Sequence, residues 1–453
     1  MNPIIKDNPR IIRAWTFYDW ANSVFPLVIT SAIFPNFYDY VTTHENGVMT
    51  DHHVEFFGRS FENQNIYSFV YAFALAIVVL IAPILSGIAD YLGNKKRFLQ
   101  FFCYLGSISC MCLFFFSRKN LELSFIPFIT ATIGFWGSLV YYNSYLPEIS
   151  SPEKQDRVSA RGFSMGYFGS SLLLIICLVG IMVFKKNPET GEGFFKVEYS
   201  FLLTGLWWLL FAQFTFLRLP SKTHSHTDPD RQHLFKKGFR ELRTVARQVT
   251  AIPMLKRFLA GFFFYNMGVQ TVMVVAVLFA RNEIQWPDEE SKTSSLIISI
   301  LIIQFVGIAG SFFFSRLSEM SGNIRALMLA VLIWVFICVF TYMFAYQPVH
   351  FYIVAFLVGF VMGGIQALSR STYSKLIPPT DDTASFFSFY DVMEKLGMII
   401  GTVTFGVISE IVGGMRPSIL SLITYFVIGF FILLSMNNVK LHAASTAPAA
   451  NDI

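Results

Sequence analysis

Long apolar stretches alternate with short polar loops along most of the chain. Each stretch approaches or exceeds the about 20 residues that a helix needs to cross roughly 30 Å of hydrocarbon. Twelve can be counted, and the first six are 15–40, 64–88, 98–116, 123–146, 163–184 and 199–219. The second six are 255–280, 293–317, 324–345, 349–373, 386–411 and 417–436. Lipid has no partner for an open strand edge, so each stretch is predicted to be a helix of an all-α polytopic membrane protein.

One long charged segment separates the two sets of six. Residues 220–253 begin as a linker-like stretch, and 231–249 then place basic residues around apolar ones at helical spacing. This pattern predicts an amphipathic helix against anionic lipids of the inner leaflet, and a solvated linker is the alternative. The predicted organisation is an N-terminal six-helix bundle at 1–219, a cytoplasmic linker at 220–253, a C-terminal six-helix bundle at 254–437 and a cytoplasmic tail at 438–453.

Composition supports a membrane location. Hydrophobic residues make up 54% of the 453 residues and charged residues 14%, where a soluble domain carries about 25%. A soluble enzyme is excluded. The net charge of +5 must be divided between the two sides of a membrane, so it does not indicate a nucleic-acid partner. Most loop Lys and Arg fall on one side when the N-terminus is placed inside, which predicts that both termini are cytoplasmic.

Neither the cysteines nor the histidines suggest a metal site. The five cysteines all lie in apolar segments and are predicted to be buried thiols: Cys103, Cys110, Cys112, Cys177 and Cys338. The eight histidines sit in loops or at segment ends without a converging third ligand. No metal and no cofactor are therefore expected.

Two sequence elements occur once in each half, which argues for an internal duplication. Phe17-Tyr-Asp in the first span matches Phe264-Tyr-Asn in the seventh. The loops after the second and eighth spans share an acid, a glycine and a base at the same spacing. These loop residues are Asp90, Gly93, Lys96 and Arg97 in the first half and Glu319, Gly322 and Arg325 in the second. They are predicted to act in a conformational switch.

Residues 87–97 and the six-plus-six layout resemble the major facilitator superfamily, whose halves are parallel repeats. The stretches 15–23, 159–167, 363–371 and 386–391 further resemble its vacuole-effluxer-like branch. The resemblance implies twelve helices in two six-helix bundles, the major facilitator fold. Fungal members are linked to amino acid efflux from the vacuole during autophagy, and bacterial members are plasma-membrane permeases. Amino acids and the plasma (inner) membrane are therefore the implied substrate class and location.

Ionisable side chains inside a bilayer cost a few kcal/mol, so those present usually pair or line a water-filled path. In the first span Tyr18 and Asn22 share one helix face and Asp19 and Ser23 an adjacent strip. All four are candidate residues of a solute pathway. Asp19 in particular could bind a substrate ammonium or carry a coupling proton. A structural salt bridge or a helix-dipole contact is an equally weighted alternative.

Gln366, Arg370 and Tyr373 face one direction in the tenth span. Arg370 could fork onto a substrate carboxylate or lock an inner gate, and we favour the gate. In the eleventh span Asp391, Glu394 and Tyr390 share a face, with Lys395 turned aside. The predicted inner gate comprises Arg161, Arg370, Tyr373, Tyr390, Asp391, Glu394 and Lys395, together with Asp19.

Further polar residues on otherwise apolar helices are candidate linings of a solute pathway. They are Asn143, Tyr167, Asn266, Gln270, Gln304 and Gln366. For each of them an interhelical hydrogen bond is at least as reasonable as contact with a solute.

The predicted function is secondary active transport of a small polar solute by alternating access, with amino acids favoured and H+ as the candidate coupling ion. A drug or lipid exporter and a non-transporting membrane sensor on a transporter fold are the alternatives. No Walker motif is present, and no Ser/His pair or in-membrane metal set suggests an enzyme. A monomer surrounded by membrane lipids is expected.

Overall fold

The computed structural model describes residues 5–45, 48–49, 53–184, 194–221 and 234–436. The predicted tail at 438–453 and most of the linker before Leu234 lie outside the described residues. Within the described part the chain is mainly helical, as the apolar pattern predicts, with two small antiparallel two-stranded sheets. The all-helical fold class is therefore confirmed apart from these short loop strands.

The helices of the first part of the chain are α1 (Pro9–Asn22), the π-helix η1 (Phe25–Ala32), α2 (Phe34–Thr43), α3 (Asn63–Tyr91), α4 (Lys95–Cys112), η2 (Leu113–Phe115), η3 (Arg118–Asn120), α5 (Leu121–Ser144), α6 (Leu146–Ile149), α7 (Gln155–Val183) and α8 (Tyr199–Arg218). Those that follow are α9 (Leu234–Ala251), α10 (Pro253–Glu283), α11 (Glu289–Ser321), α12 (Asn323–Phe344), α13 (Pro348–Leu376), α14 (Thr383–Val412) and α15 (Met415–Leu434). The strands are β1 (His44–Glu45), β2 (Val48–Met49), β3 (His53–Phe56) and β4 (Arg59–Glu62).

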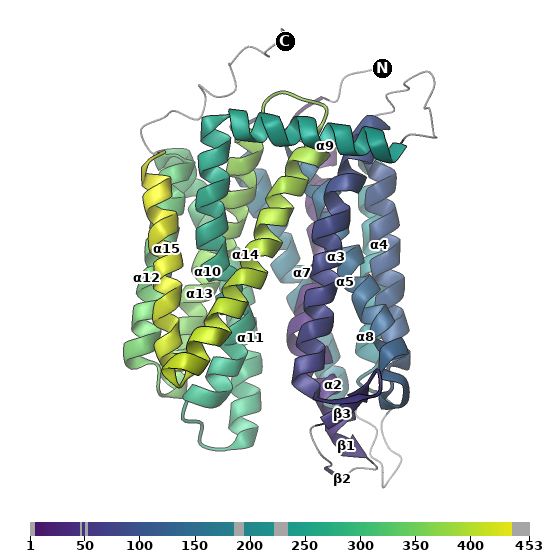
Figure 1. Ribbon diagram of the computed structural model, residues 1–453, viewed down its shortest axis with the longest axis vertical. Helices are drawn as coiled ribbons and strands as arrows, with labels where there is room; N and C mark the ends of the chain where they lie inside the picture. Colours follow the sequence, from purple (N-terminus) through teal and green to yellow (C-terminus); the bar gives the residue numbers. More distant parts are fainter. Residues whose placement is uncertain (1–4, 46–47, 50–52, 185–193, 222–233, 437–453) are drawn as a thin grey trace.

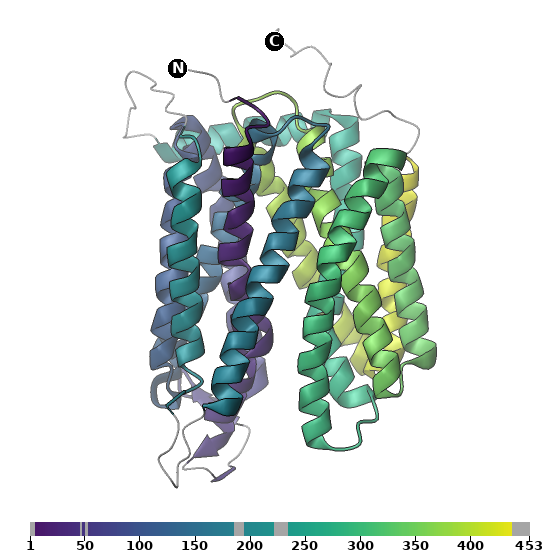
Figure 2. The same ribbon diagram turned by 180° about the vertical axis from the view of Figure 1, so that it is seen from behind.

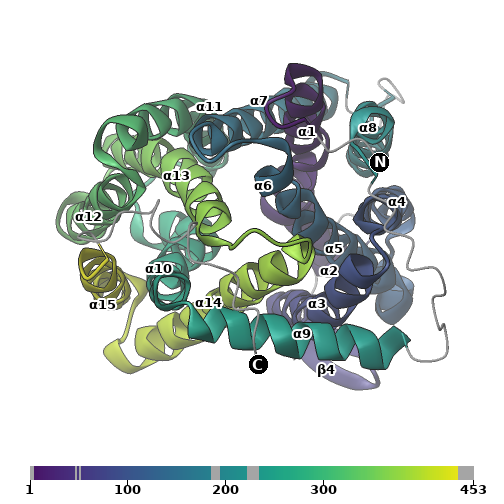
Figure 3. The same cartoon turned by 90° about the horizontal axis from the view of Figure 1, so that it is seen from above.

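The long helices form two groups that stand side by side, α1 to α8 (the first half) and α10 to α15 (the second half) (Figure 1). The beginning of α1 and the end of α15 lie at one end of the bundle, the upper end in Figures 1 and 2, and the strands lie at the opposite end. The helix α9 crosses the upper end and packs on α3, α10 and α14, so it touches both halves (Figure 3).

Eleven of the described helices are long and apolar enough to cross a membrane. The first expected span, 15–40, is instead divided among α1, η1 and α2, each shorter than 18 residues. Pro26 lies at the start of η1, where its missing N–H interrupts the backbone ladder, and its carbonyl accepts bonds from Thr30 Oγ1 at 2.7 Å and Ser31 Oγ at 2.8 Å. The predicted count of twelve spans therefore stays a prediction.

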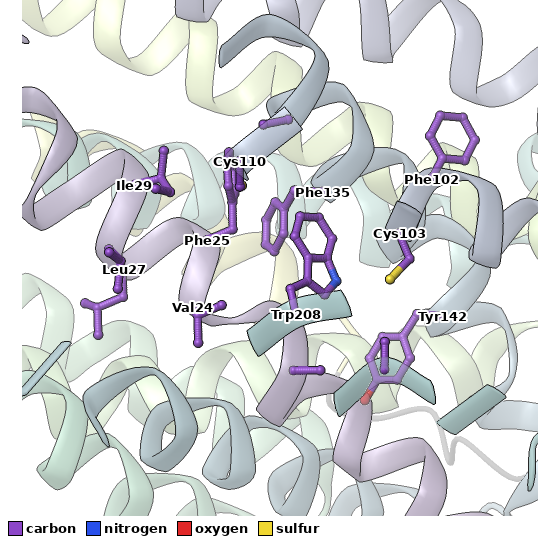
Figure 4. Close-up of a cluster of buried hydrophobic side chains, with 14 of the residues drawn as sticks. Val24, Phe25, Leu27, Ile29, Phe102, Cys103, Cys110, Phe135, Tyr142 and Trp208 are labelled. Atoms are coloured by element: carbon purple, nitrogen blue, oxygen red, sulfur yellow. The ribbon is translucent and has the colours of Figure 1, made fainter. Parts of the chain in front are cut away.

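Each half has its own cluster of buried hydrophobic side chains. Figure 4 shows part of the cluster in the first half, where Phe25, Phe135 and Trp208 lie together. Cys103 and Cys110 are buried there, in agreement with the sequence. Cys112 is exposed, so its prediction as a buried thiol is wrong, because it lies on the outward face of α4.

The helices α11 and α13 approach closely through glycines. A Cβ atom placed on Gly363 would overlap the backbone of Gly307, and one on Gly310 would overlap the backbone of Phe360. The small residues in the tenth predicted span therefore allow this close approach, as expected for helices packed in a membrane.

We expect Gly363→Val to lower the thermal stability of the purified protein, because its side chain would force α11 and α13 apart. Overpacking of this kind costs about 1–3 kcal/mol or more. Gly406→Val on α14 is the matched control, since a Cβ there meets no atom within 4 Å. Equal melting temperatures for the two variants in detergent would contradict this account of the helix contact.

Candidate functional site

A deeply buried ion pair joins the two halves. Arg370 of α13 and Asp19 of α1 have side chains that are 3% and 6% exposed. Both terminal nitrogens of Arg370 lie 3.4 Å from Asp19 Oδ2. The same oxygen accepts a hydrogen bond of 2.7 Å from the Tyr142 hydroxyl of α5. Asp19 is thus an acceptor for groups from both halves.

The guanidinium of Arg370 is fully used by partners in the first half. Its Nε donates to Ser159 Oγ and its Nη2 to Ser159 O, each at 2.9 Å, while Nη1 donates to Asn143 Oδ1 at 3.3 Å. With the two bonds to Asp19, five hydrogen bonds match the five N–H groups of an arginine. Ser159 Oγ in turn donates to the Ala367 carbonyl at 2.8 Å. In this conformation Arg370 joins α13 to α1, α5 and α7 and has no N–H to offer a solute.

Arg161 lies outside this cluster in the described conformation, and its place in the gate stays a prediction. It is exposed, whereas the next residue, Gly162, faces the ion pair. A Cβ at Gly162 would clash with Asp19 Oδ2 and with Arg370 Nη2. One residue along a helix is a rotation of about 100°, which turns Arg161 away from the contact.

A second ion pair joins the halves nearer the upper end. Lys375 Nζ at the end of α13 lies 2.6 Å from Asp156 Oδ2 at the start of α7. Asp156 also accepts from Asn323 Nδ2 at 2.7 Å and from Ser318 Oγ at 2.9 Å. The carboxylate that contacts this second repeated loop is therefore Asp156 of α7 and not the acid of the loop itself, Glu319. Glu319 lies on the exposed face of α11, beside Arg316 at 4.0 Å, and its role in a conformational switch stays a prediction.

Asp90 accepts from the first turn of α14, in the other half. Its Oδ2 lies 2.7 Å from the Ser385 N–H and its Oδ1 3.3 Å from that of Ala384. A carboxylate is stabilised there by unpaired N–H groups and the helix dipole. Beside it, Lys95 Nζ pairs with Glu148 at 2.6 Å and donates to Thr383 Oγ1 at 2.9 Å.

The other residues of the two related loops have simpler environments. Gly93 and Gly322 both have positive φ, 61° and 89°, a backbone region that favours glycine and explains the repeated residue. Lys96 Nζ donates to the Leu219 carbonyl at 2.8 Å. Arg97 and Arg325 are exposed.

Asp391, Glu394 and Lys395 form a cluster of their own on α14. Lys395 is buried and pairs with Asp391 Oδ1, and it lies 3.3 Å from Glu394 Oε2. The prediction that Lys395 turns aside is wrong, because residues four apart on a helix are neighbours. Asp391 lies eight residues, or about 12 Å, beyond the start of α14, and Lys395 twelve residues, or about 18 Å. The place of these three residues in the inner gate stays a prediction.

Tyr373 and Tyr390 belong to the packing of the second half. The Tyr373 hydroxyl donates to the Phe386 carbonyl at 2.6 Å, and the Tyr390 ring stacks on Phe262 with centroids 4.3 Å apart. Tyr18 likewise packs inside the first half against Tyr142. All three side chains are buried in this conformation. The gate role of Tyr373 and Tyr390 and the pathway role of Tyr18 stay predictions.

The remaining predicted linings include hydrogen bonds between helices and several incompletely bonded groups. Tyr167 of α7 donates to Gln366 Oε1 of α13 at 2.8 Å. Gln270 of α10 donates to Glu394 Oε1 at 3.1 Å and to Asn266 Oδ1 at 3.4 Å. Three buried atoms of these predicted linings have no hydrogen-bond partner among the described residues, namely Asn22 Nδ2, Asn266 Nδ2 and Gln304 Oε1. Ser23 Oγ lies 3.5 Å from Asn22 Oδ1.

Sequence reasoning missed several partners. They are Tyr142, Glu148, Asp156, Ser159 and Lys375. Lys and Arg near the loops predict which side of the membrane a loop faces, but they do not predict which acid a given residue such as Lys375 contacts. The acids Glu148 and Asp156 flank the loop between two spans, and this position on both sides of one loop is the signal that could have identified them.

Comparison with known proteins identifies the family of the chain. The family model described as "Vacuole effluxer Atg22 like" matches residues 7–444. The protein described as "Uncharacterized MFS-type transporter YxiO" of Bacillus subtilis is 31% identical over 421 residues, covering 93% of each chain. Autophagy-related protein 22 of Vanderwaltozyma polyspora is 23% identical over 505 residues, covering 97% of this chain and 94% of its own.

Solved structures share the fold. The transporter FucP in its outward conformation has a TM-score of 0.65 at 14% identity and covers 96% of this chain and 99% of its own. The human organic anion transporter MFSD10 has a TM-score of 0.67 at 11% identity, covering 94% of this chain and all of its own. Family and fold are those of a transporter of the major facilitator type and not of an enzyme.

A double-mutant cycle should measure the coupling of Asp19 and Arg370. We expect Arg370→Gln to cost about 3–5 kcal/mol of stability, because it leaves the Asp19 carboxylate buried without its cation. Asp19→Asn in the same chain removes that charge, so the double variant should be more stable than Arg370→Gln alone. The measurement is the unfolding midpoint of the four proteins in detergent, and strictly additive effects would contradict a direct pair.

Proposed function

The chain belongs to the vacuole effluxer Atg22-like family of major facilitator transporters, and from that premise we propose that it moves a small zwitterionic solute by alternating access. Amino acids are the favoured class, and a proton is the coupling ion. The proposal places the two moving units at 1–219 and 254–437, joined by the segment that contains α9.

One observation carries the proposal: polar contacts between the halves gather at the upper end. Three contacts join the first half to the second: Asp19 with Arg370, Asp156 with Lys375, and Asp90 with the start of α14. Each contact pairs groups that water can also solvate, so each can break without a large penalty when that end opens. Such a set is the two-state element that alternating access needs.

The solute class follows from the polar groups that stay partly exposed inside the bundle. They are Ser23, Asn143, Gln304, Gln366 and Glu394, from both halves. Glu394 can attract an ammonium group, and the amide groups can donate to or accept from a carboxylate. When the upper end opens, Arg370 loses Ser159 and Asn143 and becomes a second partner for a carboxylate. A solute with both charges suits this set better than an apolar drug or lipid.

The chain is a multi-pass membrane protein, and we place it in the plasma membrane with the upper end in the cytoplasm. The exposed arginines of α9, Arg240, Arg243 and Arg247, suit contact with anionic lipids of that leaflet. The closed upper end would then correspond to a conformation that opens away from the cytoplasm.

The test is uptake and counterflow of a labelled amino acid panel in proteoliposomes, with and without an imposed pH gradient. We expect saturable uptake of at least one panel member that a pH gradient increases. No flux of any member would overturn the amino acid assignment and direct the search to drugs, lipids or a sensing role.

Arg370→Lys serves as the gate variant in the same assay. It keeps the charge but loses the fork to Ser159, and since charge-assisted hydrogen bonds contribute about 1.5–3 kcal/mol each, we expect transport to fall by about tenfold or more. Arg316→Lys is the matched control, since Arg316 is an exposed cation of the neighbouring helix α11. Equal rates for the two variants would contradict the role of Arg370 as a gate.

A further inference from the structure

The two buried ionic clusters differ in their charge balance. In the first, one carboxylate, Asp19, faces one guanidinium, Arg370. In the second, two carboxylates, Asp391 and Glu394, share one ammonium, Lys395. The first cluster is neutral, whereas the second carries one surplus negative charge when all three groups are ionised.

Of the four carboxylate oxygens in this cluster, Asp391 Oδ2 is the one without a partner among the described residues. Glu394 has a partner on each oxygen, Gln270 at 3.1 Å and Lys395 at 3.3 Å. Asp391 is 3% exposed, its Oδ1 pairs with Lys395, and its Oδ2 is buried without a hydrogen-bond partner in the described chain. A buried carboxylate oxygen without a partner is costly, and a bound positive charge removes the cost.

The groups that face this cluster leave the surplus in place. The titratable side chains that interact with it from neighbouring helices are Tyr71 of α3, Tyr141 of α5 and Tyr265 of α10, along with Tyr390 of α14 itself. All are neutral phenols at ordinary pH. Arg370 of α13 interacts with Tyr390 beside the cluster, and its donors are already committed to Asp19, Ser159 and Asn143.

A proton fits the free position better than a metal cation does. Hard cations need several oxygen ligands at once, and Asp391 Oδ2 offers a single free oxygen. Among the described residues no group of three or more His, Cys, Asp or Glu side chains is placed to hold a metal ion. Proton binding at Oδ2 neutralises the buried carboxylate and leaves Lys395 paired with Glu394.

The cluster also contacts the first half, so its environment depends on the relative position of the two halves. Lys395 Nζ lies 3.8 Å from the ring centroid of Trp136, on α5 of the first half. When the halves move apart or together, the ammonium loses or gains this cation–π contact, and its need for carboxylate partners changes accordingly. Protonation of Asp391 is thereby linked to the conformational change.

We infer that Asp391 is the proton-carrying residue of this transporter, with Glu394 and Lys395 as its positioning partners, and that Asp19 holds the gate without carrying the proton. The inference rests on the proposed transport function for its consequence, but the protonation itself can be measured without a known solute. Adding a proton to Asp19 would leave Arg370 as an uncompensated buried cation, which argues against that site.

The first experiment is a pH series of infrared difference spectra of the full chain in lipid. We expect the C=O stretch of a buried protonated carboxylic acid in the wild type, in Asp19→Asn and in Glu410→Gln, an exposed acid of the same helix. The band should vanish in Asp391→Asn. In Glu394→Gln it should persist but titrate at lower pH, because the surplus charge is gone. A band absent from the wild type, or kept in Asp391→Asn, would falsify the inference.

The second experiment uses the proteoliposome assay with an amino acid that the wild type moves. Asp391→Asn should reduce gradient-driven accumulation to the equilibrium ratio and remove the pH dependence of counterflow, while Asp391→Glu restores both and Glu410→Gln behaves as the wild type. Gradient-driven accumulation by Asp391→Asn would overturn the assignment. If no solute is moved but the infrared band behaves as expected, the transport proposal fails and the protonation site stands. Melting temperatures identify any variant that does not fold.

Discussion

A charge inside an apolar helix bundle must find a partner, and the polar architecture of this protein depends on that constraint. Arg370 satisfies it with five hydrogen bonds, four of them to Asp19 and Ser159. Lys375 satisfies it with Asp156. In both cases the cation belongs to one half and its partners to the other. The halves therefore meet at the upper end because the charges there require it, and the end can open only when water or a solute replaces those partners.

The same constraint separates two kinds of ionic cluster. A balanced pair such as Asp19 and Arg370 is stable only while both members remain ionised and in contact, which suits a lock. An unbalanced set such as Asp391, Glu394 and Lys395 is satisfied best when it holds one additional positive charge, which suits a site that binds and releases a proton. The two clusters also draw on different helices of the second half, since Arg370 lies on α13 and the other three residues lie on α14. The proposed gate and the proposed coupling site can therefore have separate chemistry within one half.

The sequence could predict which helices exist and which polar residues matter, but not how they pair. Length and apolarity specify a membrane helix directly, and rare ionisable residues such as Asp19, Arg370 and Asp391 are identifiable because they are costly in lipid. Pairing depends on the rotation of each helix about its axis, which only packing decides. Successive residues of a helix point about 100° apart, so a prediction that is wrong by one residue selects the wrong face. Gly162 and Ser318 face the contacts between the halves, whereas their neighbours Arg161 and Glu319 face outward. The broken first span escaped prediction for a similar reason, since Pro26 permits a kink without specifying a π-helix.

The two related loops show what a duplication preserves. In the first half the acid Asp90 lies at the end of α3 and accepts from the start of α14. In the second half the corresponding contact at the end of α11 uses Ser318, and its acid, Asp156, lies on the facing helix α7. Each contact thus keeps one carboxylate, and in both cases the carboxylate belongs to the first half: Asp90 on the repeated loop and Asp156 on the facing helix. The partners differ. Asp90 accepts from backbone N–H groups, which are fixed by their helix, whereas Asp156 pairs with the side chain of Lys375, which can change rotamer. The contact at Asp90 therefore fixes the start of α14 more tightly than the contact at Asp156 fixes the end of α13.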